Sequence, residues 1–401
     1  MNMQESSVLT INGGSSSIKF ALFAVADAPI RQLRGKIDRL GERDATITLT
    51  DLASGENQIR SVGALDHRSA TGYLLDWLEE RVGLASLKAV GHRIVNGGAR
   101  YKEPQPITSE LMDELRRISA YAPEHLPSEI AMIELFSGRA PTLLQAACFD
   151  TAFHQHMPRV AKILPIPRRY EALGVERLGF HGLSYAFLVE ELTRVAGVEA
   201  ASSRVIMAHL GNGASLSAVR GGKCIDTTMG FTPAAGVPMG TRSGDLDPGL
   251  VLFFAQAEGL SAERFHRMVN HEAGLLGVSE TSSDLRDLLD RETRDVRASE
   301  AVDLFCYQVK KSIGSFATAL GGLDTLVFTG GIGENSSAIR ARICADLDFL
   351  GVQLDATRND GSEPVISTDS GCVCVRVIAT DEEMMIAKAV SGILDRTHSK
   401  E

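Results

Sequence analysis

The sequence lacks any apolar run that approaches the roughly 20 residues of a membrane-spanning helix. Its first residues, 1–7, are polar and lack the basic and then apolar blocks of a signal peptide. Basic side chains are not in surplus either, because the formal net charge is -10. We therefore expect no membrane and no nucleic acid among its partners, although a local basic pocket is compatible with this charge.

Cysteines are few, and none belongs to a regular framework. Six are scattered through apolar segments of the 401 residues, and among them only Cys372 and Cys374 lie close together. Their C-x-C spacing falls in a strand-like run, so we interpret them as structural thiols rather than as metal ligands. Free thiols of this kind are typical of a reducing cytosol, and we expect a cytoplasmic protein.

The chain also has no low-complexity linker, yet 401 residues with 44% hydrophobic side chains are enough for two domains. Strand-like runs alternate with amphipathic helical stretches, which predicts an α/β fold. The predicted strands include residues 8–11, 205–208, 325–329 and 373–378, and the predicted helices include residues 128–136, 183–195, 301–320 and 382–394.

A weak internal repeat relates the two halves of the chain. Residues 8–20 predict a strand, a polar glycine turn and a second strand, and residues 205–219 repeat this scheme. A duplicated α/β domain would produce this pattern, and chance similarity between two glycine turns is the alternative.

The first of these turns combines Asn12, Gly13 and Gly14 with three serines and Lys19. Glycines let the backbone approach a ligand, and consecutive amides with small hydroxyls accept phosphate oxygens. The spacing is not that of a Walker loop, and a strand rather than a helix follows. An ordinary serine-rich hairpin is the alternative for one such turn, but the second turn at 209–213 favours a nucleotide site.

A third glycine cluster, at residues 329–335, lies between a predicted strand and a predicted helix. This arrangement suits contact with a nucleotide or an anion, although it lacks the full dinucleotide fingerprint. A plain strand-to-helix turn is the alternative.

Four charged or titratable residues stand among glycines or directly after an apolar stretch: Arg93, Arg242, Asp150 and His181. An arginine fork matches carboxylate and phosphate oxygens. Solvent-exposed arginines and a core histidine are the alternatives for each residue taken singly.

Together these segments resemble the acetate kinase family of the acetate and sugar kinase, heat-shock chaperone and actin superfamily. The resemblance covers nearly the whole chain. Its motifs are residues 12–20, 91–93, 149–154, 179–182, 209–213, 229–233, 239–245, 282–286, 331–335 and 380–383.

The resemblance implies a duplicated actin-like, ribonuclease H-like fold with a nucleotide cleft between two lobes. We expect residues 1–150 with 382–401 to form one lobe, and residues 151–381 to form the other and carry most of the nucleotide site. The implied activity is acetate kinase, in which the γ-phosphoryl group of ATP passes reversibly and in line to acetate. The implied partners are a small carboxylate, ATP or ADP, Mg²⁺ with Mn²⁺ as a substitute, and a second copy of the chain in a homodimer.

The resemblance also implies roles for individual residues. Asp150, His181 and Arg242 correspond to catalytic residues, and Arg93, Val95, Phe180 and Pro233 to substrate-binding residues. Asn12 and Glu382 correspond to residues around the metal. The nucleotide contacts are expected from Lys19, His209, Leu210, Gly211, Asn212, Gly213, Asp284, Leu285, Arg286, Gly331, Ile332, Gly333, Glu334 and Asn335.

Several positions depart from the family pattern, among them Leu126 in place of a usual asparagine and Leu183 in place of a usual threonine. Glu124 stands where a pocket leucine is usual, Tyr185 where a histidine is common, and Asn96 where a histidine is frequent. Since a desolvated carboxylate beside an anionic substrate is costly, we expect Glu124 to turn out of the acyl pocket. A propionate or butyrate kinase remains an alternative, as does, more remotely, a nucleotide-binding protein without kinase activity.

Overall fold

The computed structural model describes residues 7–14, 17–26 and 28–398, and these divide into two compact units. Unit 1 comprises residues 1–152 and 381–401, and unit 2 comprises residues 153–380. Within the described part of the chain, every helix is too short or too polar to cross a membrane.

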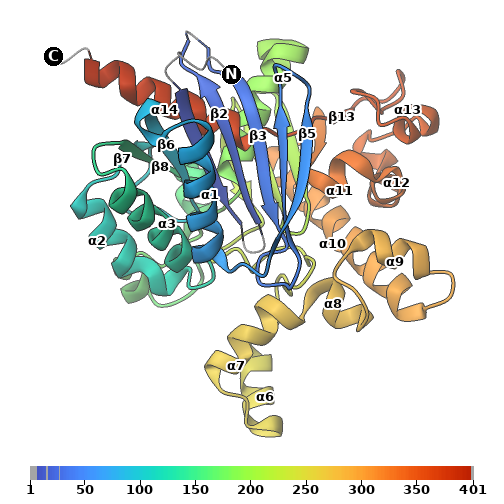
Figure 1. Cartoon of the computed structure of the whole chain (residues 1–401). Coiled ribbons are helices and arrows are strands. Elements are labelled where there is room, and N and C mark those ends of the chain that lie inside the picture. Colours follow the sequence, from blue (N-terminus) through green and yellow to red (C-terminus); the bar gives the residue numbers. More distant parts are fainter. Residues whose placement is uncertain (1–6, 15–16, 27, 399–401) are drawn as a thin grey trace. The chain divides into compact units, whose positions relative to one another are not determined.

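Unit 1 is built on an eight-stranded sheet with the order β5-β4-β3-β2-β1-β6-β8-β7 (Figure 1). Its strands are β1 (Ser7–Gly13), β2 (Ser17–Ala24), β3 (Ile30–Asp38), β4 (Ala45–Asp51), β5 (Asn57–Gly63), β6 (Leu87–Ile94), β7 (Gln105–Pro106) and β8 (Leu144–Phe149). Its helices are α1 (His67–Arg81), α2 (Ser109–Ile118), α3 (Leu126–Arg139) and α14 (Glu382–His398).

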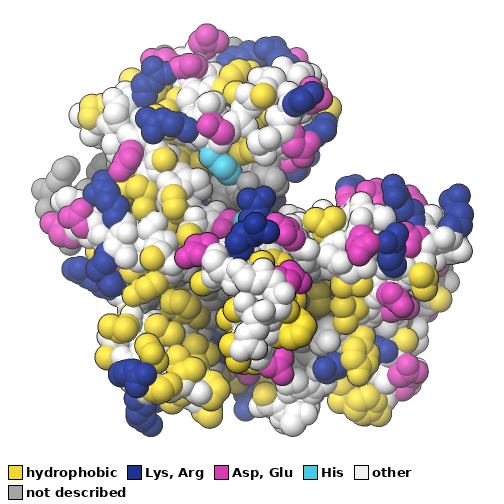
Figure 2. Space-filling view, turned by 90° about the horizontal axis from the view of Figure 1, so that it is seen from below, with side chains coloured by type: hydrophobic (Ala, Val, Ile, Leu, Met, Phe, Trp, Pro, Cys, Tyr) yellow, Lys and Arg dark blue, Asp and Glu magenta, His cyan; other side chains and the backbone are white. Residues whose placement is uncertain are grey.

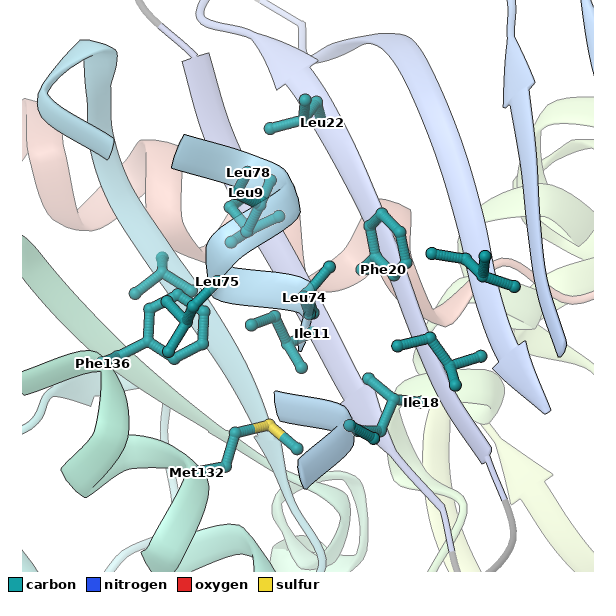
Figure 3. Close-up of a cluster of buried hydrophobic side chains, with 14 of the residues drawn as sticks. Leu9, Ile11, Ile18, Phe20, Leu22, Leu74, Leu75, Leu78, Met132 and Phe136 are labelled. Carbon is teal, nitrogen blue, oxygen red and sulfur yellow. The ribbon is translucent and has the colours of Figure 1, made fainter. Parts of the chain in front are cut away.

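Because successive side chains of a strand point to opposite faces, β2 contributes apolar side chains to both faces of this sheet. Phe20 and Leu22 belong to the core under α1 and α3, whereas Ala21 and Phe23 pack with α14. Figure 3 shows the first of these cores, in which leucines of α1 lie over side chains of β1 and β2.

Helix α14 approaches β6 closely at Gly91. A Cβ atom at this position would lie 2.4 Å from a methyl group of Ile386 and 2.6 Å from one of Val390. The glycine is therefore required for the C-terminal helix to pack on the first sheet, which brings Glu382, at the start of α14, into unit 1.

Unit 2 contains a five-stranded sheet with the order β11-β10-β9-β12-β13. Its strands are β9 (Arg204–Leu210), β10 (Ala214–Arg220), β11 (Lys223–Thr227), β12 (Thr325–Thr329) and β13 (Cys374–Val377). Its helices are α4 (Arg159–Lys162), α5 (Gly182–Ser202), α6 (Gly249–Glu258), α7 (Ala262–Arg267), α8 (Gly274–Ser279), α9 (Leu285–Arg291), α10 (Val296–Leu320), α11 (Gly330–Asn335), α12 (Ser337–Cys344) and α13 (Ala356–Asp360). Helix α5 packs on the sheet through a core that includes Leu188 and Leu192.

Five strands of each sheet share one order and one set of directions. In unit 1, β3-β2-β1-β6-β8 pair antiparallel, antiparallel, parallel and parallel, and β11-β10-β9-β12-β13 pair in the same sequence in unit 2. The duplicated α/β fold expected from the sequence repeat is thereby confirmed. All six cysteines are free thiols.

Candidate functional site

Arg93 and Asp150 are brought together by the parallel pairing of β6 with β8. Arg93 lies opposite Cys148 in this register, and Asp150 follows the end of β8. Nε and Nη2 of Arg93 donate to Oδ2 of Asp150 at 3.0 and 2.5 Å. Nη1 of Arg93 donates to the carbonyl of Gly13 at 3.2 Å, so the guanidinium joins the ends of three strands.

Burial and charge oppose one another at Arg93. Burial alone lowers the pKa of the guanidinium, but the carboxylates of Asp150, Glu382 and Glu129 together raise the pKa above its ordinary value. Arg93 is therefore a permanent cation, and a permanent positive charge is what the binding of an anion requires.

Asn12 and Glu382, 370 positions apart in the chain, meet at the start of α14. Nδ2 of Asn12 donates to Oε2 of Glu382 at 2.6 Å and to Oε1 of Glu383 at 3.5 Å. Lys19 lies opposite Asn12 in the β1–β2 hairpin. A carboxylate and an amide oxygen in one place suit Mg²⁺, which keeps several of its own waters. Ser15 and Ser16 of the same turn lie outside the described residues.

Glu129 of α3 is a buried carboxyl group that the sequence reasoning missed. Both of its oxygens accept from the backbone N–H of Val95, at 3.2 and 3.1 Å. Its exposed fraction is 4%, and burial raises its pKa to about 8 against the lowering effect of Arg93. The available signal was its place on the apolar stripe of α3, between Leu126 and Ile133.

Glu124 and Asn96, two of the departures from the family pattern, lie in unit 1. Glu124 is exposed, in agreement with the expectation that it turns outward. Asn96 is buried, and its Oδ1 accepts from the backbone N–H of Gly98 at 2.8 Å. Asn96 thus acts as a turn residue at the end of β6.

His181 begins α5 from a constrained backbone. It is the N-cap residue, with a φ of 59° that non-glycine residues seldom adopt. Its Nδ1 lies 2.8 Å from Oγ of Ser215 on β10. Its ring stacks on that of His209, with centroids 4.2 Å apart and planes 20° from parallel.

The backbone carbonyl of Phe180, which directly precedes His181, is hydrogen-bonded to the ring of His154. Nε2 of His154 lies 2.9 Å from this carbonyl, and Nδ1 lies 3.1 Å from Sγ of Cys224. Burial lowers the pKa of His154 to about 4 and raises that of Cys224 to about 12. The neutral ring therefore donates from Nε2 to the carbonyl and accepts from the thiol.

His181 and Arg242 converge on the space beside Gly213. A Cβ atom on Gly213 would lie 3.3 Å from Nε2 of His181 and 3.6 Å from Nη1 of Arg242. Nη1 of Arg242 also donates to the carbonyl of Pro233 at 3.3 Å. Two nitrogen atoms thus lie beside one small volume that a glycine leaves open, and a space of this kind suits the oxygens of a phosphoryl group.

Three of the segments predicted to bind nucleotide lie together in unit 2. The N–H of Gly240 donates to the carbonyl of Asn212 at 3.2 Å, and a Cβ on Gly240 would lie 3.2 Å from the carbonyl oxygen of Ser283. A Cβ on Gly211 would lie 3.9 Å from the backbone nitrogen of Gly331. The glycine turn 211–213, residues 331–333 of α11 and the segment before α9 are therefore neighbours.

Side chains in these segments have local roles of their own. Oδ1 of Asp284 caps α9 by accepting from the N–H of Arg286 at 2.9 Å, and Leu285 is buried in the core. Oε1 of Glu334 accepts from the N–H of Gly330 at 2.8 Å and from that of Thr380 at 3.3 Å. The carboxylate of Glu334 therefore braces the ends of two chain segments.

The three residues expected to receive the methyl group differ in their exposure. Val95 and Phe180 are both buried, and Pro233 is half-buried. Val95 belongs to unit 1, whereas Phe180 and Pro233 belong to unit 2.

Known proteins resemble this chain over nearly its whole length. A family model described as "Acetokinase family" matches residues 7–388. A propionate kinase of Citrobacter rodentium is 42% identical over 393 residues, which are 96% of each chain. An acetate kinase of Bacillus cytotoxicus is 41% identical over 392 residues, which are 96% of this chain and 98% of the relative.

Solved structures show the same fold. The acetate kinase of Porphyromonas gingivalis matches with a TM-score of 0.85 and 36% identity, over 97% of this chain and 100% of that one. A propionate kinase of Francisella tularensis matches with a TM-score of 0.88 and 34% identity, over 96% and 98% of the two chains. Fold, site and relatives together define a kinase with a duplicated actin-like fold.

The chain belongs to the acetokinase family. The family expected from the sequence motifs is thereby confirmed.

Proposed function

We propose that this protein transfers the γ-phosphoryl group of ATP directly and in line to acetate, in a reversible reaction that yields acetyl phosphate and ADP. The observation that carries the proposal is the convergence of His181 Nε2 and Arg242 Nη1 on the space beside Gly213. Donors fixed in advance around one point stabilise the charge that the phosphoryl oxygens carry in the transition state.

In this proposal Arg93 binds the substrate carboxylate, and Asp150 orients the attacking acid or a metal-bound water. Acetate is already an anion near neutral pH, so the reaction needs positioning and charge neutralisation rather than a strong base. The methyl group is received by an apolar pocket formed from Val95, Phe180 and Pro233.

The nucleotide is proposed to contact Lys19 together with residues 209–213, 284–286 and 331–335. Asn12 and Glu382 would hold Mg²⁺, for which Mn²⁺ can substitute, because their oxygens are ligands that these ions prefer. When bound, the ion supplies positive charge that neutralises the phosphates. Since the reaction consumes ATP and the cysteines are free thiols, we place it in the cytoplasm.

Propionate is the second candidate substrate. Relatives named propionate kinase and acetate kinase match this chain at nearly equal identity, 42% and 41%. One methylene group in an apolar pocket changes the binding free energy by only about 1–3 kcal/mol. We therefore expect propionate to be a weaker substrate rather than a rejected one, and butyrate weaker still.

We further propose that the protein is a homodimer, with the surface around α6 in contact with the second copy. None of the residues of α6 is buried, although most of them are apolar. Leu252 and Phe253 are 62% and 58% exposed. Figure 2 looks at the molecule from the side of α6 and α7, and hydrophobic side chains gather on this face. A monomeric mass in sedimentation at micromolar protein would contradict this part.

The function is tested by measuring ADP release from ATP and Mg²⁺ with and without acetate, with hydroxylamine present to trap acyl phosphate. The proposal predicts that acetate stimulates ADP release and that hydroxamate forms in equal amount. ADP release that is independent of acetate would instead indicate a nucleotide-binding protein without carboxylate kinase activity.

A further inference from the structure

A chain of two hydroxyl groups leads from the core of unit 2 to the ring of His181. The phenol oxygen of Tyr185 lies 2.5 Å from Oγ of Ser215, and Ser215 Oγ lies 2.8 Å from Nδ1 of His181. Tyr185 is one helical turn after His181, on the same face of α5, and Ser215 projects from β10. Tyr185 and Ser215 are both fully buried.

The direction of the protons in this chain follows from the chemistry of the phenol. Burial is the main effect on Tyr185 and raises its pKa well above the ordinary value, so the group keeps its proton. Its hydrogen bonds with Ser215 and with the backbone of His209 act in the opposite direction but are outweighed. Because a phenol is a stronger acid than an alcohol, the phenol donates to Ser215 Oγ, and the serine's own proton is left for Nδ1 of His181.

We propose that Tyr185, acting through Ser215, holds His181 in the tautomer that carries its proton on Nε2. In the proposed phosphoryl transfer, on which this inference rests, Nε2 is the atom that faces the space beside Gly213. Tyr185 is then a positioning residue, because it never touches the substrate and acts only through the ring of His181. A neutral imidazole held in this way donates to a phosphoryl oxygen without first being protonated.

A second pair of hydroxyl groups leads in the same way to Nδ1 of the neighbouring His209. Oγ1 of Thr380 donates to Oγ of Ser184 at 2.8 Å, and Ser184 Oγ lies 2.8 Å from Nδ1 of His209. The ring of His209 stacks on that of His181, so the two relays lie side by side. Both relays thus favour the tautomer that carries its proton on Nε2.

The test compares the parent protein with Tyr185→Phe, which removes only the phenol hydroxyl. Two-bond proton–nitrogen correlation spectra of the ¹⁵N-histidine-labelled full chain report the tautomer of each ring, and the His181 signal is assigned as the one lost in His181→Gln. The parent is expected to show a single tautomer with the proton on Nε2. Tyr185→Phe is expected to show mixed tautomers, and its kcat should fall about tenfold, which corresponds to roughly 1.4 kcal/mol, with little change in KM for the carboxylate.

Ser215→Ala should reproduce both effects, and the double variant should lose no more than either single variant, because the two hydroxyls act in series. Tyr307→Phe, the same change at an exposed site on α10, should leave the tautomer and kcat unchanged. A single Nε2–H tautomer in both Tyr185→Phe and Ser215→Ala, or additive losses in the double variant, would overturn the proposal. The spectra do not depend on turnover, so a tautomer shift in a protein inactive on acetate would support the relay while contradicting the proposed function.

Discussion

Arg93 donates two hydrogen bonds to one oxygen of Asp150, from Nε and Nη2 to Oδ2 at 3.0 and 2.5 Å. The arginine side chain is 11% exposed and that of the aspartate 0%. A buried pair of this geometry fixes the direction of the guanidinium, and removal of one partner leaves the other charge uncompensated. The carboxylate of Asp150 therefore orients Arg93.

Substitution of the proposed catalytic residues should separate binding from turnover. We expect Asp150→Ala and Arg242→Ala to lower kcat by roughly a hundredfold or more, because each removes charge stabilisation of the transition state. Arg93→Ala should raise KM for the carboxylate and lower kcat together. Steady-state kinetics on variants with parent-like circular dichroism decide this, and near-normal turnover in Asp150→Ala or Arg242→Ala would refute the assigned roles.

The opening beside Gly213 can be tested with a single methyl group. Gly213→Ala places a Cβ atom 3.3 Å from Nε2 of His181, in the space proposed for the phosphoryl oxygens. We expect kcat to fall at least about tenfold, or roughly 1.4 kcal/mol, with no loss in melting temperature. Gly314→Ala on α10 is the matched control, since a Cβ there meets nothing within 4 Å. Parent-like kinetics in Gly213→Ala would show that this space is not used.

Glu129 should make the stability of the protein depend on pH. Burial raises its pKa from 4.5 to about 8, so between these values the folded protein keeps a proton that the unfolded chain has lost. Its stabilising contribution is complete below the lower value and is lost as the pH rises through the higher one. Glu129→Gln, which keeps an oxygen for the N–H of Val95, should therefore gain stability relative to the parent as the pH rises.

Denaturant unfolding at about pH 5 and about pH 8 measures this gain, which we expect to be at least about 1.4 kcal/mol, the equivalent of one pKa unit. Glu124→Gln, an exposed change five residues earlier, is the control and should show no such trend. An equal difference between Glu129→Gln and parent at both pH values would mean that Glu129 ionises normally.

The exposed position of Glu124 predicts a small role in substrate choice. Glu124→Leu should change KM for acetate only a few-fold and should not invert the preference for acetate over propionate. A gain in acetate affinity of more than about tenfold, or roughly 1.4 kcal/mol, would mean that this carboxylate polarises the acyl pocket.

The parts of the fold with a strong local signal were predicted from the sequence. The glycine turns after Ile11 and Leu210 do join antiparallel strands. The period-two and helical patterns predicted strands β1, β2, β9, β10, β12 and β13 and helices α3, α5, α10 and α14. Glu129 was missed because a lone glutamate in a helix reads as a solvent-exposed residue until tertiary packing buries it. The hydrogen bond between Tyr185 and Ser215 could not be predicted from the sequence either. The two residues are 30 positions apart, and their contact depends on the packing of α5 against β10.

Steady-state kinetics of the purified protein with acetate, propionate and butyrate test the central claim most directly. Formation of ADP and of trapped hydroxamate would be followed at saturating ATP and Mg²⁺. The account predicts saturation with all three acids and equal yields of the two products. It also predicts that kcat/KM is highest for acetate and falls with each added methylene by a factor equivalent to about 1–3 kcal/mol at most. A higher kcat/KM for propionate than for acetate would contradict acetate as the preferred substrate, and an absence of hydroxamate with every acid would contradict phosphoryl transfer to a carboxylate.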